Sequence, residues 1–423
     1  MKKSCNIGFV STRFAGNDGV SLETKKWREV LSNLGYRCFF FGGDCDEADR
    51  EYSYVVPEAH FQHPDIQEIY QVGFSSPVRP AAITDRIQKN KDHLKQHLYN
   101  FTKMFDIQLL IPENALAIPL NIPLGIALTE YIAETSMPVI AHHHDFFWER
   151  KRFLVNCVWD YLNMAFPPHL PSIRHVVINS SASNQLSLRT GVSAMLIPNI
   201  MDFDHPPPAP DEYTDSMRSD MGIAPDEYFF LQPTRVVQRK GIEHAIELIN
   251  QLDRKARLVI SHASGDEGHD YEQRVRNYAS LLNVPTNFVT EIIRDQRSIL
   301  EDGRKVYTLW DAYQCADLVT YPSTIEGFGN AFLEAIYFHK PILVNNYSIF
   351  ATDIKPKGFR VVEFDGYTTE QTVWFVQRIL DDPNLVQEMT EYNYQLARRY
   401  YGYAMLERRL QTLMMECFGE DQC

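Results

Sequence analysis

Short apolar runs alternate along the chain with longer segments of helical period. This alternation is typical of parallel sheets that helices cover on both faces. In the first half it predicts strands at Cys5 to Val10, Arg37 to Phe41, Ile107 to Ile111, Val139 to His142, His175 to Ile178 and Met195 to Ile197. In the second half it predicts strands at Tyr228 to Gln232, Arg257 to Ser261, Asn287 to Thr290, Leu318 to Tyr321, Ile342 to Asn345 and Val361 to Phe364.

Helices are predicted in the gaps between these strands. The clearest has one apolar face, made by Ile83, Ile87, Leu94, Leu98, Phe101 and Phe105, while its lysines face water. In the second half we expect helices from Gly241, His269, Thr308, Gly329 and Thr369, followed by helical periodicity through Leu385 to Tyr400 and Met405 to Met414.

A proline-rich segment separates the two halves. Asp202 to Asp215 contains Pro206, Pro207, Pro208 and Pro210 between acidic residues, a composition that does not fit a sheet and predicts a linker. We therefore expect two doubly wound, Rossmann-like α/β domains, residues 1–204 and 205–400, followed by a helical end at 401–423. Open parallel sheets bind ligands outside the carboxyl ends of their strands, so a cleft between the domains is the expected site.

Composition and charge narrow the class of protein. The 423 residues are 44% hydrophobic and 23% charged, which is the balance of a globular protein and excludes disorder and coiled coil. The 41 basic and 55 acidic residues give a formal net charge of -14, so we expect no nucleic-acid partner.

No segment predicts a membrane span or a secretion signal. The longest uncharged apolar stretch, Asn114 to Thr129, is interrupted by Pro119 and Pro123, and the first apolar run stops at Val10. Seven cysteines without Cys-x-x-Cys spacing indicate reduced thiols rather than a zinc cage. We expect a cytoplasmic protein.

The strongest chemical motif follows the strand Leu318 to Tyr321. Glu326 lies in a loop with Gly327 and Gly329, and Glu334 lies two turns into the next helix, so each carboxylate can address a different part of one ligand. The glycines allow close approach of the backbone, and the start of the helix offers free N–H groups. An ordinary helix start with a solvated glutamate is the structural alternative.

A basic motif follows the first strand of the second half. Arg235 and Lys240, with Arg239 and Gly241, combine a planar fork with a point charge, and together they can hold a diphosphate whose negative charge grows as a bond breaks. A solvated loop is the alternative for this motif taken alone.

The two motifs, in this order and in two alternating α/β domains, resemble the retaining GT-B glycosyltransferases of family four, the group 1 glycosyltransferases. The segment Ile197 to Asp202 is similar to the family's strand exit before the linker, although the family usually has a glycine at the position of Ile200. The resemblance implies an acceptor-side first domain, a second domain that binds the nucleotide-sugar, and a C-terminal helix that packs back on the first domain.

The resemblance also implies roles for individual residues. Arg235 and Lys240 hold the donor diphosphate, Glu326 contacts the hydroxyls of the donor sugar, and Glu334 binds the ribose. In the first domain His144 lies near the donor sugar, with Asp145 as its neighbour. The implied catalytic residues are Glu326, Arg235, Lys240 and His144; the donor-binding residues are Gly327, Phe328, Gly329, Asn330, Glu334 and Gly19, the last from Gly16-Asn17-Asp18-Gly19; and the acceptor residues are Asp145 and Asn114.

Two patterns could bind a metal, and we expect neither to do so. His142, His143 and His144 are consecutive, and alternating side chains of an extended chain point to opposite faces, so the three cannot converge on one ion without another ligand. Asp-x-Asp occurs at both Asp44 to Asp46 and Asp202 to Asp204, as is expected by chance in an acidic chain. The second of these lies in the predicted linker.

The predicted function is metal-independent, retaining transfer of a hexose, glucose or mannose, from a UDP-, GDP- or ADP-sugar to a hydroxyl of a small, polar, sugar-like acceptor, with no cofactor. The alternatives are transfer to a lipid-linked or polysaccharide acceptor, an epimerase or phosphorylase of the same fold, and a non-catalytic nucleotide-sugar-binding protein of the same fold. The nucleotide base, the acceptor and the oligomeric state stay open.

Overall fold

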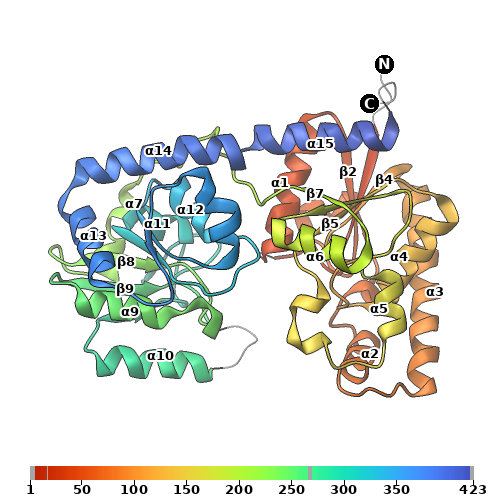
Figure 1. Cartoon of the computed structure of the whole chain (residues 1–423), viewed down its shortest axis with the longest axis horizontal. Helices are drawn as coiled ribbons and strands as arrows, with labels where there is room; N and C mark the ends of the chain where they lie inside the picture. The colour runs from red at the N-terminus through yellow and green to blue at the C-terminus, as the bar shows by residue number, and fades with distance from the viewer. Residues whose placement is uncertain (1–4, 17, 265–268, 420–423) are drawn as a thin grey trace. The chain divides into compact units, whose positions relative to one another are not determined.

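The computed structural model describes residues 5–16, 18–264 and 269–419, and the chain forms two compact units (Figure 1). Unit 1 comprises Met1–Ile200 and Tyr403–Cys423, and unit 2 comprises Met201–Gly402. The chain therefore passes from one unit to the other twice. The proline-rich residues 205–211 contain neither helix nor strand, and the short helix α7 (Glu212–Asp215) follows them.

Unit 1 is built on a sheet whose strands, in the described part of the chain, run parallel in the order β3-β2-β1-β4-β5-β6-β7. The strands are β1 Asn6–Val10, β2 Arg37–Gly42, β3 Ser53–Val55, β4 Ile107–Pro112, β5 Val139–His143, β6 Ile173–Val177 and β7 Ala194–Leu196. The sequence predicts all of these except β3. This edge strand is short and partly exposed, so it has no apolar run that could reveal it.

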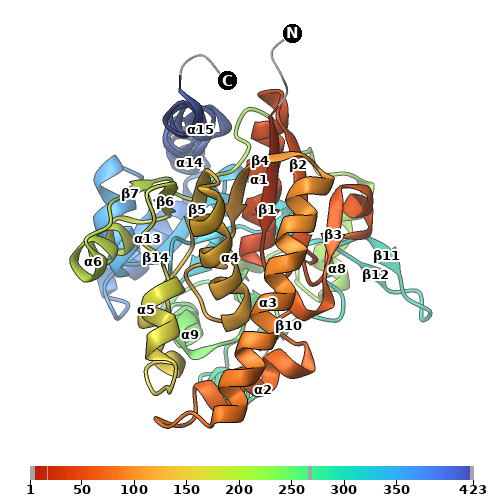
Figure 2. The same ribbon diagram turned by 90° about the vertical axis from the view of Figure 1, so that its right-hand side faces the viewer.

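Helices cover both faces of this sheet because alternate strand residues point to opposite sides. Phe39 and Phe41 pack with α3 and α4, which lie side by side (Figure 2), whereas Cys38 and Phe40 pack with α1 and α15. The helices of unit 1 are α1 Gly19–Asn33, α2 Pro64–Gly73, α3 Ala81–Met104, α4 Ile122–Thr135, α5 Trp159–Ala165, α6 Ser180–Thr190 and α15 Tyr403–Phe418, with 3-10 turns η1 Glu47–Tyr52, η2 Pro57–Ala59, η3 Phe147–Glu149 and η4 Lys151–Phe153.

Unit 2 contains a second parallel sheet, with the order β10-β9-β8-β13-β14-β15 in the described residues. Its strands are β8 Tyr228–Gln232, β9 Ala256–Ile260, β10 Thr286–Phe288, β13 Leu318–Tyr321, β14 Ile342–Asn345 and β15 Val362–Phe364. All six were predicted within two residues. The sequence did not predict the antiparallel pair β11 Ser298–Ile299 and β12 Lys305–Val306, whose strands are too short to show a period.

The helices of unit 2 again cover both faces of its sheet. On one face α9, α10 and α13 bury their apolar residues against the strands, and α11 and α12 contact β8, β13 and β14. The helices are α8 Met217–Asp220, α9 Ile242–Gln251, α10 Asp270–Leu281, α11 Leu309–Cys315, α12 Asn330–Tyr337, α13 Glu370–Asp381 and α14 Pro383–Tyr401, together with α7, the 3-10 turns η5 Gln238–Lys240 and η8 Lys355–Lys357, and the π-helical turn η7 Phe350–Ile354.

Each sheet reverses its strand order at one point, between β1 and β4 in unit 1 and between β8 and β13 in unit 2. At such a point the connections leave on opposite sides and open a crevice at the carboxyl ends of the strands. Both chemical motifs of unit 2 follow the two strands that flank its reversal. The fold therefore places them where a doubly wound sheet binds its ligand.

Within the residues that the structure describes, no helix combines the length and the apolar composition needed to cross a membrane.

Candidate functional site

In unit 2 the two motifs meet through a buried ion pair. Lys240 ends η5 after β8, and its Nζ contacts Oε1 of Glu326 in the loop after β13. Arg239 contributes a second cation, with Nη1 3.2 Å from Oε2 of the same carboxylate. Both Lys240 and Glu326 are largely buried, with side chains 11% and 9% exposed. Ion pairs thus connect two segments that are far apart in the sequence, at the carboxyl edge of the sheet.

Backbone contacts fix the two loops in register. Thr324 donates its N–H to the carbonyl of Arg239 over 2.8 Å, and its hydroxyl donates to the same carbonyl over 3.1 Å. Gly241, between η5 and α9, has a φ of 57°, and a Cβ built on it lies 2.6 Å from the carbonyl oxygen of Pro322. A residue with a side chain at position 241 is strained and pushes the loops apart.

The electrostatics keep Glu326 ionised. Burial by itself raises the pKa of this carboxyl group, but the charges of Lys240 and Arg239 and the hydrogen bond from Lys240 hold the pKa below its ordinary value. Lys240 also lies 5.6 Å from the centre of the Tyr321 ring, close enough for a cation–π contact. Arg235, an exposed residue in the same loop, adds a third positive charge near Lys240.

The rest of the loop leads directly into α12. Gly327 is exposed, whereas Phe328 is buried against Tyr401, with ring centres 5.2 Å apart. Gly329 precedes the helix with a φ of 118°, and a Cβ there would lie 2.7 Å from the hydroxyl of Tyr347. Asn330 is the first residue of α12. Glycine at 329 is therefore required by both the backbone conformation and the packing.

Glu334 lies one turn into α12 rather than the two turns expected from the sequence, because the helix begins only at Asn330. Its Oε2 accepts a hydrogen bond of 2.7 Å from the hydroxyl of Tyr313 on α11. The structure thus places the two glutamates of the motif in different surroundings: Glu326 between cations, and Glu334 beside a tyrosine.

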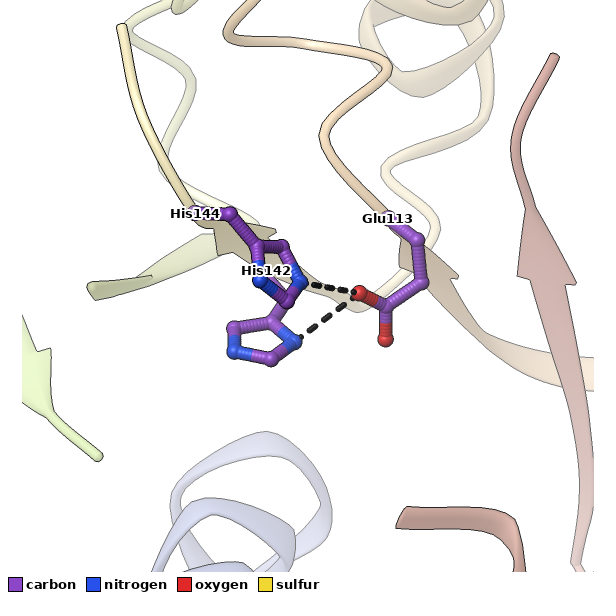
Figure 3. Close-up of side chains that lie close together, drawn as sticks. All are labelled: Glu113, His142 and His144. Carbon is purple, nitrogen blue, oxygen red and sulfur yellow. Dashed lines mark hydrogen bonds and ion pairs between the residues drawn. The ribbon is translucent and has the colours of Figure 1, made fainter. Parts of the chain in front are cut away.

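In unit 1 a second buried cluster joins β4 to β5. Glu113 follows β4 and is fully buried, and its Oε2 lies 2.9 Å from Nδ1 of His142 and 3.2 Å from Nε2 of His144 (Figure 3). Burial raises the pKa of Glu113, but the charges and hydrogen bonds of both histidines more than offset this and lower it. The cluster therefore holds an ionised carboxylate between two imidazoles.

The predicted alternation of the three histidines is confirmed. His142 and His144 point to the same side as Glu113, and the indole of Trp27 stacks on His142 with ring centres 4.1 Å apart. His143 faces the opposite side, where its Nε2 lies 2.9 Å from Nδ1 of His175. Glu113 carries no role that the sequence alone predicts, because its contact with residues 29 and 31 positions away depends on β4 and β5 being neighbours.

The two predicted acceptor residues lie beside this cluster and contact each other. Asn114 donates from Nδ2 to Oδ1 of Asp145 over 3.0 Å, and its Oδ1 accepts the N–H of His144 over 3.1 Å. Asp145 also accepts a 2.6 Å hydrogen bond from Nε of Arg150. Asn114 has a φ of 57°, which an Asn tolerates better than most residues. It connects the turn after β4 to the turn after β5.

The glycine-containing turn after β1 caps a helix. Asp18 accepts hydrogen bonds of 3.1 Å from the N–H groups of Val20 and Ser21, and Gly19 is the first residue of α1. Gly16 has a φ of 96° and donates its N–H to Asp46. Asn17, part of the predicted turn, lies outside the described residues. Asp18 is thus the N-cap residue of α1.

One group of described residues has the spacing that a metal ion needs. The donor atoms of Glu113, His142 and His144 lie within 4.8 Å of one another. The hydrogen bonds to the carboxylate already join all three side chains. In the same described residues, neither Asp-x-Asp sequence belongs to such a group: Asp46 pairs with Lys25, and Asp204 with Arg398.

A cavity of about 460 Å³ lies elsewhere in unit 2, lined by residues that include Asp226, Lys255 and Pro285. These residues precede β8, β9 and β10, so the cavity opens at the amino ends of the strands. A doubly wound sheet binds its ligands at the other edge, and this cavity is not part of the candidate site.

The chain is similar in sequence to known proteins. The sequence model described as "Glycosyl transferases group 1" matches residues 214–396. The chain is 30% identical over 435 residues to the Mannosylglucosylglycerate synthase of Thermotoga maritima, covering 95% of this chain and 97% of that protein. The protein of the same name from Petrotoga mobilis is also 30% identical, over 84% of this chain and 86% of its own length.

Solved structures share the fold at low sequence identity. A glycosyltransferase from Rickettsia africae has a TM-score of 0.69 at 12% identity, covering 99% of this chain and 100% of its own. The Anabaena protein HepE in complex with UDP-glucose has a TM-score of 0.64 at 12% identity, covering 97% and 99%. Two doubly wound units of this kind define a GT-B glycosyltransferase fold. By its sequence the chain belongs to the group 1 glycosyltransferases.

The close approach at position 241 gives a first prediction. Gly241→Ala should lower the free energy of unfolding by more than the ~1–2 kcal/mol that a left-handed alanine costs, because the Cβ also meets the backbone of Pro322. Gly222→Ala is the matched control, since Gly222 has a φ of 69° and open space around its Cβ. Denaturant unfolding of both variants tests this, and equal losses would contradict the proposed loop contact.

The buried ion pair gives a second prediction. Lys240→Met should lower the free energy of unfolding by ~3 kcal/mol, because it leaves the buried carboxylate of Glu326 with Arg239 alone. Adding Glu326→Gln should restore part of this loss, because the unpaired charge is then gone. Lys255→Met, which breaks the exposed pair with Asp226, should have little effect. A double variant no more stable than Lys240→Met would show that the two residues do not interact energetically.

Proposed function

We propose that this protein is a retaining mannosyltransferase that moves mannose from a nucleotide-mannose to a hydroxyl of glucosylglycerate. The observation that carries this proposal is the similarity along 95% of the chain to a protein named Mannosylglucosylglycerate synthase. Its product name describes a mannosyl group on glucosylglycerate, which is a small, polar sugar acid. Of the two hexoses that the sequence leaves open, this similarity favours mannose.

In this proposal unit 2 binds the donor. Arg239 and Lys240 contact the single carboxylate of Glu326, and Arg235 adds a third positive charge near Lys240, so the cluster has positive charge in excess and attracts a diphosphate. Glu326 contacts the sugar hydroxyls, and the backbone of Gly327 to Asn330 lies against the sugar. Glu334 accepts from the ribose hydroxyls, and Tyr313 orients it.

The chemical step follows from these assignments. The bond between the anomeric carbon and the diphosphate oxygen breaks, and the acceptor hydroxyl oxygen bonds to the same carbon from the same face. The acceptor proton passes to the departing phosphate oxygen. Lys240 and Arg235 stabilise the negative charge that develops on the diphosphate. We therefore assign no side-chain nucleophile, and we propose that the step needs no metal or cofactor.

In unit 1 we assign acceptor contacts to Asn114 and Asp145, and a substrate contact to His144. These three residues are held together by hydrogen bonds between the turns after β4 and β5. Gly19 is assigned to the donor side through its position at the start of α1.

A lipid acceptor is the second candidate. The observation that favours it is a 26% identity to the Alpha-galactosylglucosyldiacylglycerol synthase of Streptococcus pneumoniae, which covers only 36% of this chain. A non-catalytic sugar-binding protein is disfavoured because Arg235, Lys240, Glu326 and Glu334 are all present.

Transfer with a panel of donors tests the proposal. Among the GDP-, UDP- and ADP-conjugates of mannose and glucose, one nucleotide-mannose should convert glucosylglycerate to mannosylglucosylglycerate, and NMR of the product should show the anomeric configuration of the donor. If the protein transfers only to diacylglycerol glycolipids, the acceptor is a lipid and not glucosylglycerate. A product with the opposite anomeric configuration would exclude a retaining reaction.

Glu326→Gln should reduce kcat by about 10²- to 10³-fold, because it removes a carboxylate that binds the sugar as its charge develops. Glu227→Gln is a matched control: Glu227 is likewise 9% exposed in its side chain and lies 3.2 Å from an arginine, Arg257, but it precedes β8 at the opposite edge of the sheet. Steady-state kinetics of both variants test the assignment. A kcat for Glu326→Gln within a few-fold of the wild type would remove Glu326 from the site.

Metal independence is tested by chelation. Because we assign the charge stabilisation to Lys240 and Arg235, dialysis against EDTA should leave kcat and KM unchanged, and adding Mg²⁺ or Mn²⁺ should not raise them. Loss of activity in EDTA, with recovery on adding one of these ions, would contradict this part of the proposal.

A further inference from the structure

We propose that Glu113 is a positioning residue of the transfer reaction: its carboxylate holds the Nε2 proton of His144 and leaves Nδ1 of that imidazole to contact the sugar substrates. This inference rests on the proposed function, in which His144 meets substrate. It assigns a role to a residue that neither the sequence motifs nor the family resemblance identified.

The exposure of the three side chains shows which of them can reach a ligand. Glu113 and His142 are 0% and 1% exposed, whereas the side chain of His144 is 10% exposed. In the residues that the structure describes, no hydrogen bond is made by Nδ1 of His144, while Nε2 is 3.2 Å from Glu113. Glu113 therefore lies behind His144 and can act on a substrate only through it.

The proton positions follow from hydrogen-bond chemistry. An ionised carboxylate only accepts, so a hydrogen bond between it and an imidazole nitrogen requires a proton on that nitrogen. The contact with Glu113 thus selects the form of His144 that is protonated on Nε2. When neutral, this form offers a lone pair at Nδ1, and when charged it offers an N–H there.

His142 and the backbone keep the carboxylate in place. The 2.9 Å bond from Nδ1 of His142 fixes the orientation of Glu113, and the indole of Trp27 stacks on the His142 ring. The main chain of Glu113 is bound on two sides, since its N–H donates to Val10 and its carbonyl accepts from the hydroxyl of Ser11. A carboxylate held this firmly is pre-organised before substrate arrives.

The charges around His144 favour the imidazolium. Burial lowers the pKa of this imidazole, but the hydrogen bond to Glu113 and the negative charges of Glu113, of Glu23 on α1 and of Asp145 in the next turn raise it above its ordinary value. Burial lowers the pKa of the neighbouring imidazole of His142, and its hydrogen bond to Glu113 places a proton on Nδ1. In its protonated form His144 offers an N–H at Nδ1 that can donate to a sugar or carboxylate oxygen.

The same three side chains have a spacing that suits a metal ion. A metal ion bound at Nε2 of His144 would replace the proton on that nitrogen. The change of the His144 signals with pH would then report release of the metal as the ligands are protonated. The two arrangements predict different spectra, so one experiment distinguishes them.

The experiment records ¹⁵N–¹H spectra of histidine-labelled protein as a function of pH, with the His144 signals assigned from their loss in His144→Asn. We expect the wild type to show a His144 pKa above 6.5 and a neutral form protonated on Nε2. In Glu113→Gln the pKa should fall. A neutral form protonated on Nδ1, or a wild-type pKa at or below 6.5, would overturn the proposal even if Glu113→Gln does not fold. Ring-nitrogen shifts that indicate metal coordination of both His142 and His144, and that EDTA reverses, would also overturn the proposal.

The pH profile of kcat/KM supplies the functional readout. Activity that needs the imidazolium is present below the pKa of His144 and is lost as the pH rises through it. In Glu113→Gln this loss should occur at lower pH, so kcat/KM should be roughly tenfold below wild type at pH 8 and within about twofold at pH 6. Glu227→Gln should keep the wild-type profile. A profile of Glu113→Gln identical to the wild type would refute the positioning role.

The two proposals fail in different ways. If no donor and acceptor pair gives product, the proposed function is wrong, yet the spectra still report the proton position of His144. If transfer occurs but the spectra or the pH profile of kcat/KM differ from those expected, the proposed function is retained and the positioning role of Glu113 is wrong.

Discussion

Parallel strands of one sheet end at the same edge, and this constraint decides where the chemistry of the protein can lie. Lys240 and Glu326 belong to loops that follow β8 and β13, which pair with each other at the reversal of strand order in unit 2. Glu113 and His144 follow the neighbouring strands β4 and β5 in unit 1. Side chains that lie tens of residues apart in the sequence thus contact each other because their strands are neighbours. The cavity at the opposite edge of unit 2 is lined by none of these four residues.

Both clusters solve the same electrostatic problem. A buried carboxylate loses its hydration and is stable only where neighbouring groups replace it. Two cations and a hydrogen bond replace the hydration of the Glu326 carboxylate, and two imidazoles replace that of the Glu113 carboxylate. Such an arrangement contributes little net stability, but it fixes the orientation of the groups that then face a ligand. Gly241 and Gly329, both at positive φ, each let a loop approach closely where a side chain would not fit.

The sequence predicted the elements far better than the contacts between them. Buried strands such as Leu318–Tyr321 are mostly apolar and easy to identify, whereas the edge strand Ser53–Val55 is partly exposed and was missed. The motif around Glu326 is local, so it could be recognised in the sequence. The partnership of Glu113 with His142 and His144 could not, because it requires the pairing of two strands; the alternation of the histidines did indicate that two of the three share a face. The contact of Arg239 with Glu326 was missed for the same reason.

The proposed function depends most on a nucleotide-sugar site formed by the loops after β8 and β13. Thermal unfolding with GDP, UDP, ADP and their mannose and glucose conjugates, with and without EDTA, tests it most directly, because a ligand that binds only the folded protein raises its stability by mass action. We expect that one nucleotide and its mannose conjugate raise Tm, that EDTA does not change the shift, and that Lys240→Met abolishes it. No shift with any of these ligands, or an undiminished shift in Lys240→Met, would contradict the proposed site.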